Sequence, residues 1–299
     1  MNIRADTKTA LVTGATGFIG SSLVSQLLNN KWEVHIIVRR KSNLYPLEKI
    51  HHRITIHQHD GSVNGMNTIF NAAKPSVVFH LASLCLSQHE TNDVDPLIQS
   101  NILFGTQLVE AMTANGVYHL INTGTSWQHY QNQEYNPVCL YAATKEAYKA
   151  ILTYYREVTP LKIVTLKLFD TYGPNDQRRK LIPLLQKTAK TNETIAMSPG
   201  EQLIDLVHVD DVVKAFEVAA ELLLNGKAGQ MEDYAISSGH HMTVKEIVKT
   251  YEKIIGSKLP IRWGGRPYRP REVMIPWDKG MRLPGWDPTI KLEDGLKNL

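Results

Sequence analysis

The chain has 299 residues, 42% of them hydrophobic, which is enough for one large α/β domain or for a domain with a smaller lobe. Its formal net charge is +4 and its basic residues are scattered along the chain, so nucleic-acid binding is not indicated. Residues 1–8 are polar and no apolar run approaches ~18 residues, so we expect neither a signal peptide nor a membrane span.

A glycine-rich turn follows the first expected strand. Residues 9–13 are apolar and β-branched, as in a buried strand, and residues 21–29 place their apolar side chains on one helical face. We interpret Gly14 as permitting the tight turn, Gly17 as admitting a pyrophosphate and Gly20 as allowing close packing of helix on strand. Because a helix N-terminus offers free N–H groups to phosphates, this unit predicts a dinucleotide site. The simpler alternative is a turn that binds nothing.

Two arginines end the second expected strand. Residues 33–38 are followed directly by Arg39 and Arg40, with no Asp or Glu at this point. In a dinucleotide fold this strand end meets the adenosine ribose, where arginine suits a 2′-phosphate and a carboxylate suits a free 2′-hydroxyl. The sequence therefore favours NADP(H) over NAD(H), and the alternative is a strand end that is only solvated.

The rest of the first half alternates between strands and helices. We expect strands at 53–58, 77–81, 119–122 and 162–168, and helices at 66–73, 96–114 and 141–157. This alternation predicts an α/β fold with a Rossmann-like, doubly wound parallel sheet.

Prolines interrupt the pattern from about Phe169 onward. They predict a smaller C-terminal substrate-binding lobe over the carboxyl ends of the strands, with further strands at 206–209 and 234–237 and a helix at 212–224. The expected domains are a dinucleotide-binding domain at 1–168, to which 203–238 returns, and a lobe at 169–299.

Tyr141 and Lys145 lie one helical turn apart, on the same face of the expected helix. A tyrosine that exchanges a proton near neutral pH needs a lowered pKa, and a lysine ammonium nearby favours the phenolate. The same lysine can hold a nicotinamide ribose. The alternative is a surface pair without a chemical role.

Together these motifs resemble the extended short-chain dehydrogenase/reductase family, the NAD-dependent epimerases and dehydratases, over essentially the whole chain. Later landmarks agree: Tyr172-Gly173-Pro174, His208-Val209-Asp210-Asp211 and Gly285-Trp286-Asp287-Pro288. The resemblance implies that the cofactor is bound by Gly14, Thr16, Gly17, Phe18, Ile19, Gly20, Arg39, Arg40, Asp60, Gly61, Leu81, Ala82, Ser83, Asn101, Tyr141 and Lys145.

The family also places a Ser or Thr at the end of the fifth strand, where its hydroxyl bonds the reacting substrate oxygen. By position Thr123 is the first choice and Thr125 the second; the alternative is that both only satisfy turn backbone groups. Sugar 4,6-dehydratases follow this threonine with Asp-Glu. Here Gly124 and Thr125 follow Thr123, so dehydration is not expected.

The substrate half departs from the family pattern. Arg269-Pro-Arg-Glu-Val resembles the family's Arg-Pro-Gly-Asp-Val, whose first arginine contacts the nucleotide or diphosphate. A second family arginine is replaced by Ile204, and the family's Asn before Tyr-Gly-Pro is Asp170, whose carboxylate would repel a diphosphate. Replacement charge is available at Arg178, Arg179 and Lys180, which equally fit a solvated helix start. The resemblance implies Asp170, Arg179 and Arg269 as substrate-binding residues.

The resemblance is strongest to nucleotide-sugar 4-ketoreductases of the CDP-paratose and CDP-abequose synthase type. It implies NADPH-dependent reduction of a nucleotide-linked 4-keto-6-deoxysugar. Alternatives are an NAD-dependent nucleotide-sugar epimerase and a non-catalytic dinucleotide sensor. We expect a cytoplasmic homodimer that binds a small-molecule nucleotide sugar and neither nucleic acid nor membrane. The two cysteines, Cys85 and Cys139, suit a reduced protein and have no metal-ligand spacing, so no metal is expected.

Overall fold

The computed structural model describes residues 8–299, so the expectation about residues 1–8 falls outside it except at Lys8. A seven-stranded, fully parallel sheet has the strand order β10-β6-β5-β4-β1-β2-β3. The order 3-2-1-4-5-6 is that of a dinucleotide-binding fold, and the predicted Rossmann-like α/β class is confirmed. The strands are β1 Thr9–Thr13, β2 Glu33–Arg39, β3 Thr55–His59, β4 Val77–His80, β5 His119–Thr125, β6 Lys162–Leu168 and β10 Met231–Ile236.

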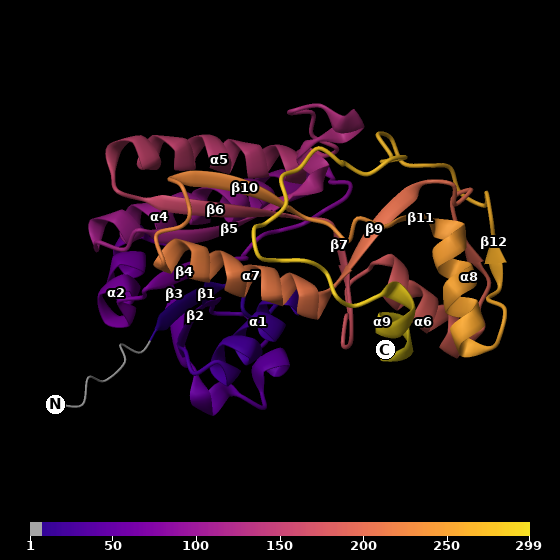
Figure 1. Ribbon diagram of the computed structural model, residues 1–299, viewed down its shortest axis with the longest axis horizontal. Helices are drawn as coiled ribbons and strands as arrows, with labels where there is room; N and C mark the ends of the chain where they lie inside the picture. The colour runs from indigo at the N-terminus through magenta and orange to yellow at the C-terminus, as the bar shows by residue number, and fades with distance from the viewer. Residues whose placement is uncertain (1–7) are drawn as a thin grey trace.

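Helices cover both faces of this sheet. α1 (Phe18–Asn29) and α7 (Val209–Leu224) lie on one face, and α2 (Val63–Ala73), α4 (Phe104–Ala114) and α5 (Leu140–Val158) lie on the other (Figure 1). Because side chains alternate across a strand, β1 sends Val12 into one apolar core and Leu11 into the other. This two-sided burial explains why the strands are nearly continuous apolar runs.

A smaller lobe begins where β6 ends, because β7 (Asp170–Tyr172) follows β6 almost directly (Figure 1). Its own apolar core includes Leu185 and Ile247. Its remaining elements are α6 Leu181–Thr191, β8 Ile195–Ala196, β9 Leu203–His208, β11 His241–Thr243, α8 Val244–Ile255, β12 Ile261–Arg262 and α9 Leu292–Lys297. β9 pairs with β7 and β11 in a three-stranded sheet, whereas α7 and β10 belong to the large sheet. The domain limits expected above stay predictions.

Several element boundaries differ from the sequence-based expectation. The third strand starts at Thr55, because His51–Arg53 form a 3₁₀ turn before it. The fifth strand continues to Thr125, and Val209 begins α7 where the end of a strand was expected. The helix expected at 96–114 is divided into α3 (Val94–Ile98), a π-helical turn (Gln99–Leu103) and α4, which follow one another without a break. No helix within residues 8–299 is long and apolar enough to cross a membrane.

Candidate active site

The glycine-rich loop is held tightly against the end of β4. Gly14 has φ +69°, and a β-carbon there would lie 2.6 Å from the Ala82 backbone nitrogen. A β-carbon on Gly20 would overlap the Gly14 carbonyl oxygen, and Gly17 N–H donates to that oxygen at 3.0 Å. The loop therefore brings the start of α1 beside the predicted cofactor residues at 81–83.

The start of α1 suits an anion. No side chain caps the helix at Gly17, which is exposed, and no acidic residue lies in the first turn. The first backbone N–H groups, from Phe18 to Gly20, therefore face outward with the positive end of the helix dipole. These residues fit the pyrophosphate of a dinucleotide.

The ends of β2 and β3 bring Arg39 close to Asp60, because Arg39 pairs in register with His59. Arg39, Arg40, Asp60 and Gly61 are all exposed. Ser62 donates its backbone N–H and its hydroxyl to Asp60, each at 2.8 Å, and these bonds lower the pKa of the Asp60 carboxyl. The structure thus gathers the predicted adenosine-side residues at one edge of the sheet.

The two candidate threonines have different surroundings. The Thr123 hydroxyl donates to the His80 carbonyl at 2.9 Å, so it ties β5 to β4. Thr125 accepts the Trp127 N–H at 3.3 Å, and its side chain acts on the Tyr141 phenol by hydrogen bonding, which lowers the pKa of that phenol. The Thr123 hydroxyl is thus engaged within the sheet, whereas Thr125 lies beside Tyr141; which of the two bonds a substrate oxygen stays a prediction.

Tyr141 and Lys145 are both buried on the inner face of α5, with Lys145 Nζ 5.9 Å from the Tyr141 ring centroid. Burial raises the pKa of Tyr141 well above its ordinary value, and the neighbouring Cys85 and Cys139 raise it further. The pKa of Tyr141 is thus raised and not lowered as expected, because burial is the largest influence on it. Burial also lowers the pKa of Lys145 to about 8. Cys85, which sequence reasoning did not select, hydrogen-bonds to Tyr141 and is exposed.

Asn101 does not present a free group to a cofactor. Its Oδ1 accepts from the Ser83 hydroxyl and the Leu84 N–H, and its Nδ2 donates to the Leu84 carbonyl and the Thr144 hydroxyl. Both donors and both lone pairs of the amide are used. Because Thr144 lies on α5 beside Tyr141, Asn101 ties the 81–84 loop to that helix; its assignment as a cofactor contact stays a prediction.

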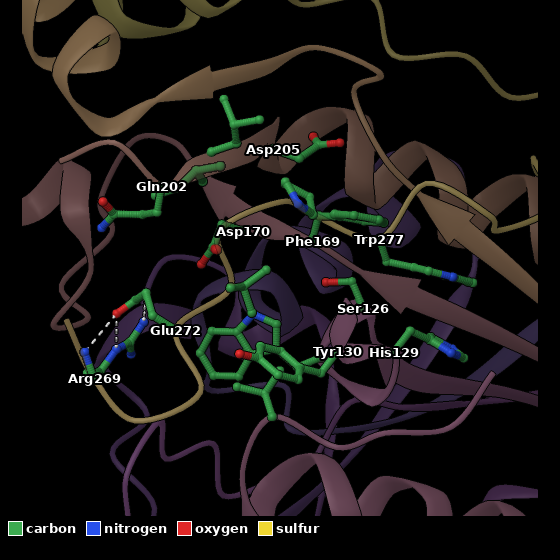
Figure 2. A pocket seen from close by; sticks show the side chains of 16 residues that line it. Ser126, His129, Tyr130, Phe169, Asp170, Gln202, Asp205, Arg269, Glu272 and Trp277 are labelled. Atoms are coloured by element: carbon green, nitrogen blue, oxygen red, sulfur yellow. Dashed lines mark hydrogen bonds and ion pairs between the residues drawn. The ribbon is translucent and has the colours of Figure 1, made fainter. Parts of the chain in front are cut away.

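A cavity opens between the carboxyl ends of the strands and the lobe. Asp170 and Arg269 line it, with Arg269 bound to Glu272 through two hydrogen bonds of 3.0 and 2.7 Å (Figure 2). Ser126, Trp127 and Ile204 also line it.

Lys180 forms an ion pair with Asp170 and so balances the negative charge of that carboxylate. Its Nζ lies 2.8 Å from Asp170 Oδ1. Burial alone would raise the pKa of Asp170, but the ion pair lowers it, and Asp170 in turn raises the pKa of Lys180. The carboxylate is thus neutralised and does not oppose a diphosphate. Arg178 is bound to Asp176 and Arg179 is exposed; neither lines this cavity, so the structure does not bring Arg179 into the site.

The sheet order, the glycine loop and the Tyr141–Lys145 pair define a nicotinamide-dependent oxidoreductase of the Rossmann type. The model of the NAD dependent epimerase/dehydratase family matches residues 10–236, so the chain belongs to that family.

Individual relatives are distant but cover nearly the whole chain. A CDP-abequose synthase from Yersinia pseudotuberculosis is 27% identical over 89% of this chain and 90% of its own length. A UDP-glucose 4-epimerase from Mycolicibacterium smegmatis is 26% identical over 96% and 95%. Among solved structures, the UDP-glucose 4-epimerase of Thermotoga maritima with UDP-glucose has a TM-score of 0.83 at 25% identity, covering 97% of this chain and 96% of that one. The expected family resemblance is confirmed.

Proposed function

We propose that the protein is an NADPH-dependent reductase that converts a nucleotide-diphosphate-linked 4-keto-6-deoxysugar to the 4-hydroxy sugar. One observation supports this proposal most strongly. Thr125, Tyr141 and Lys145 lie together beside a cavity that is lined by Arg269. A CDP-abequose synthase among the relatives supports it.

In the proposed reduction, Tyr141, Lys145 and Thr125 each have a separate role. When bound, the nicotinamide cofactor supplies the hydride that adds to the ketone carbon. Tyr141 donates its phenolic proton to the ketone oxygen, and its raised pKa keeps that proton in place beforehand. The Lys145 ammonium stabilises the resulting tyrosinate, and the Thr125 hydroxyl donates a hydrogen bond to the same oxygen. The ketone gains one hydride and one proton, which gives the alcohol.

The protein has no carboxylates at the positions where a dehydratase has its acid and base. With Thr125 as the reacting hydroxyl, the next two residues are Ser126 and Trp127, and neither carries a carboxylate. Neither threonine is therefore followed by the Asp-Glu pair of the dehydratases. Arg39 and Arg40 support NADPH as the cofactor, because they stand where a 2′-phosphate would lie.

An NAD-dependent epimerase is the second candidate, favoured by the UDP-glucose 4-epimerases among the relatives and similar structures. It would use the same Thr125, Tyr141 and Lys145 but would keep its cofactor through the cycle.

We also propose a homodimer that forms through the face of α5 and the adjoining π-helical turn. Tyr154, Val158 and Leu103 are 62%, 58% and 51% exposed there, which leaves large apolar side chains in water.

The proposed activity is tested by an NADPH-oxidation screen with CDP-, dTDP-, UDP- and GDP-linked 4-keto-6-deoxysugars. We expect oxidation with at least one of them. Tightly co-purified NAD, with sugar interconversion but no net cofactor consumption, would favour the epimerase. Tight NADPH binding without turnover of any nucleotide sugar would favour the non-catalytic sensor.

A further inference from the structure

Trp127 is fixed relative to the reacting hydroxyl. It lies in the 3₁₀ turn Ser126–Gln128 that directly follows β5, and its backbone N–H donates to Thr125 Oγ1 at 3.3 Å. Its carbonyl accepts from Val138 N–H at 2.9 Å. With both backbone groups held, the Trp127 backbone has a defined position next to Thr125.

The Trp127 indole also lies close to two cationic side chains, Lys180 and Arg269. Trp127 is half-buried and lines the cavity, and Lys180 Nζ and Arg269 Cζ lie 5.1 and 5.8 Å from its ring centroid. Trp127 therefore contacts Thr125 through its backbone and lies near the Lys180 and Arg269 cations through its indole.

A nucleotide sugar has one part that matches the reacting groups and another that matches the cations. Its ketone must reach Thr125 and Tyr141, and its diphosphate must reach a cation. The hexose ring joins the two, and Trp127 adjoins both Thr125 and Arg269. We propose that the Trp127 indole is the platform for the hexose ring and the residue that selects a sugar with an apolar, deoxy face. This inference rests on the proposed function, whose substrate it narrows.

The chemistry of an indole explains the selection. Its broad apolar surface packs against ring C–H groups and a methyl group, but it offers no hydrogen bond to a hydroxyl placed over it. An apolar contact of this kind discriminates by about 10- to 100-fold, which is the range expected for a single added or missing group. Trp127 is thus a specificity residue rather than a proton donor or acceptor.

Equilibrium binding tests the platform without any need for turnover. Calorimetry would compare a nucleoside diphosphate with its 4-keto-6-deoxyglucose and glucose derivatives, using whichever of the CDP, dTDP, UDP or GDP series binds most tightly. We expect Trp127→Ala to weaken the deoxysugar derivative by about 10- to 100-fold and the bare diphosphate by less than about 2-fold. The preference for the deoxysugar over the glucose derivative should largely disappear.

Trp127→Phe is the matched control, because it keeps an aromatic face and tolerates the same backbone geometry. It should retain most of the deoxysugar affinity. In the wild type, the nucleotide sugar but not the diphosphate should change tryptophan fluorescence, and Trp127→Phe should abolish that change.

Equal weakening of the diphosphate and its sugar derivative would contradict the platform, since Trp127 would then act only through the cations or the fold. Unchanged deoxysugar affinity in Trp127→Ala would contradict it as well. Sugar-selective loss of binding in a protein that never oxidises NADPH would support the platform and refute the reductase. NADPH oxidation by the wild type, together with equal weakening of the diphosphate and the sugar derivative in Trp127→Ala, would support the reductase and refute the platform.

Discussion

At the scale of single residues, sequence patterns picked out the candidate reacting groups but not their hydrogen bonds. Thr123 and Thr125 are two residues apart on one strand, so they share a face and cannot be separated by periodicity. What separates them is a neighbour from another part of the chain: the His80 carbonyl for Thr123 and the Tyr141 phenol for Thr125.

Paired variants test this assignment. Thr125→Ala should lower kcat by about 10- to 100-fold, because the ketone oxygen loses a donor. Thr123→Val should leave kcat nearly unchanged and lower the free energy of unfolding by about 1 kcal/mol, because the buried His80 carbonyl loses its donor. Steady-state kinetics and denaturant unfolding measure the two effects. A larger kinetic loss at Thr123 than at Thr125 would return the catalytic role to Thr123.

The pH dependence should report Lys145. Burial lowers the pKa of this lysine to about 8, so its ammonium is present below that pH and is lost above it. Because the ammonium stabilises the tyrosinate formed in the reaction, we expect kcat/KM to fall as pH rises through about 8. In Lys145→Arg, whose guanidinium stays charged, any residual rate should lack this alkaline limb. The same limb in the arginine variant would assign it to another group.

At the scale of elements, the βα units were predictable because their signals are local. The apolar runs, the helical periodicity and the glycine spacing occur within a few residues of each other. The helices and strands of the lobe were harder to predict, because its prolines suggested interruptions where regular elements form. Pro183, for example, lies in the first turn of α6, where proline removes no helical hydrogen bond. The start of α8 did carry a local signal, the capping box of Thr243 and Glu246.

The end of β2 should determine the choice of cofactor. Replacing Arg39 and Arg40 with Gln should weaken NADPH much more than NADH, because each charge-assisted phosphate contact contributes about 1.5–3 kcal/mol. Fluorescence titration with both cofactors measures the difference. An equal loss for NADPH and NADH would show that neither arginine contacts the 2′-phosphate.

The segment after β12 should bind the diphosphate through Arg269. Arg269→Ala should raise the KM for the nucleotide sugar by about 10-fold or more and barely change NADPH affinity, because a bidentate cation is lost. Glu272 holds that guanidinium with two hydrogen bonds and competes with the substrate for it. Glu272→Gln is therefore expected to lower the KM. An unchanged KM in Arg269→Ala would point to Lys180 as the main diphosphate contact.

At the scale of the whole molecule, the site depends on contacts between distant segments. Trp127 follows β5, Asp170 begins β7 and Arg269 comes from near the C-terminus, and no local pattern shows that they line one cavity. The family resemblance supplied this long-range arrangement, and the departures at Asp170 and Ile204 were interpretable only once Lys180 was seen to pair with Asp170.

The fate of the transferred hydrogen tests the central claim most directly. NADPH carrying deuterium at the transferable position of its nicotinamide would be incubated with the best 4-keto-6-deoxysugar, and the product examined by NMR and mass spectrometry. A reductase places one deuterium on sugar C4 and forms one NADP⁺ per product, and Tyr141→Phe abolishes both while still binding NADPH. Interconversion of 4-hydroxy sugars without label incorporation or NADPH loss would contradict the reductase and identify an epimerase.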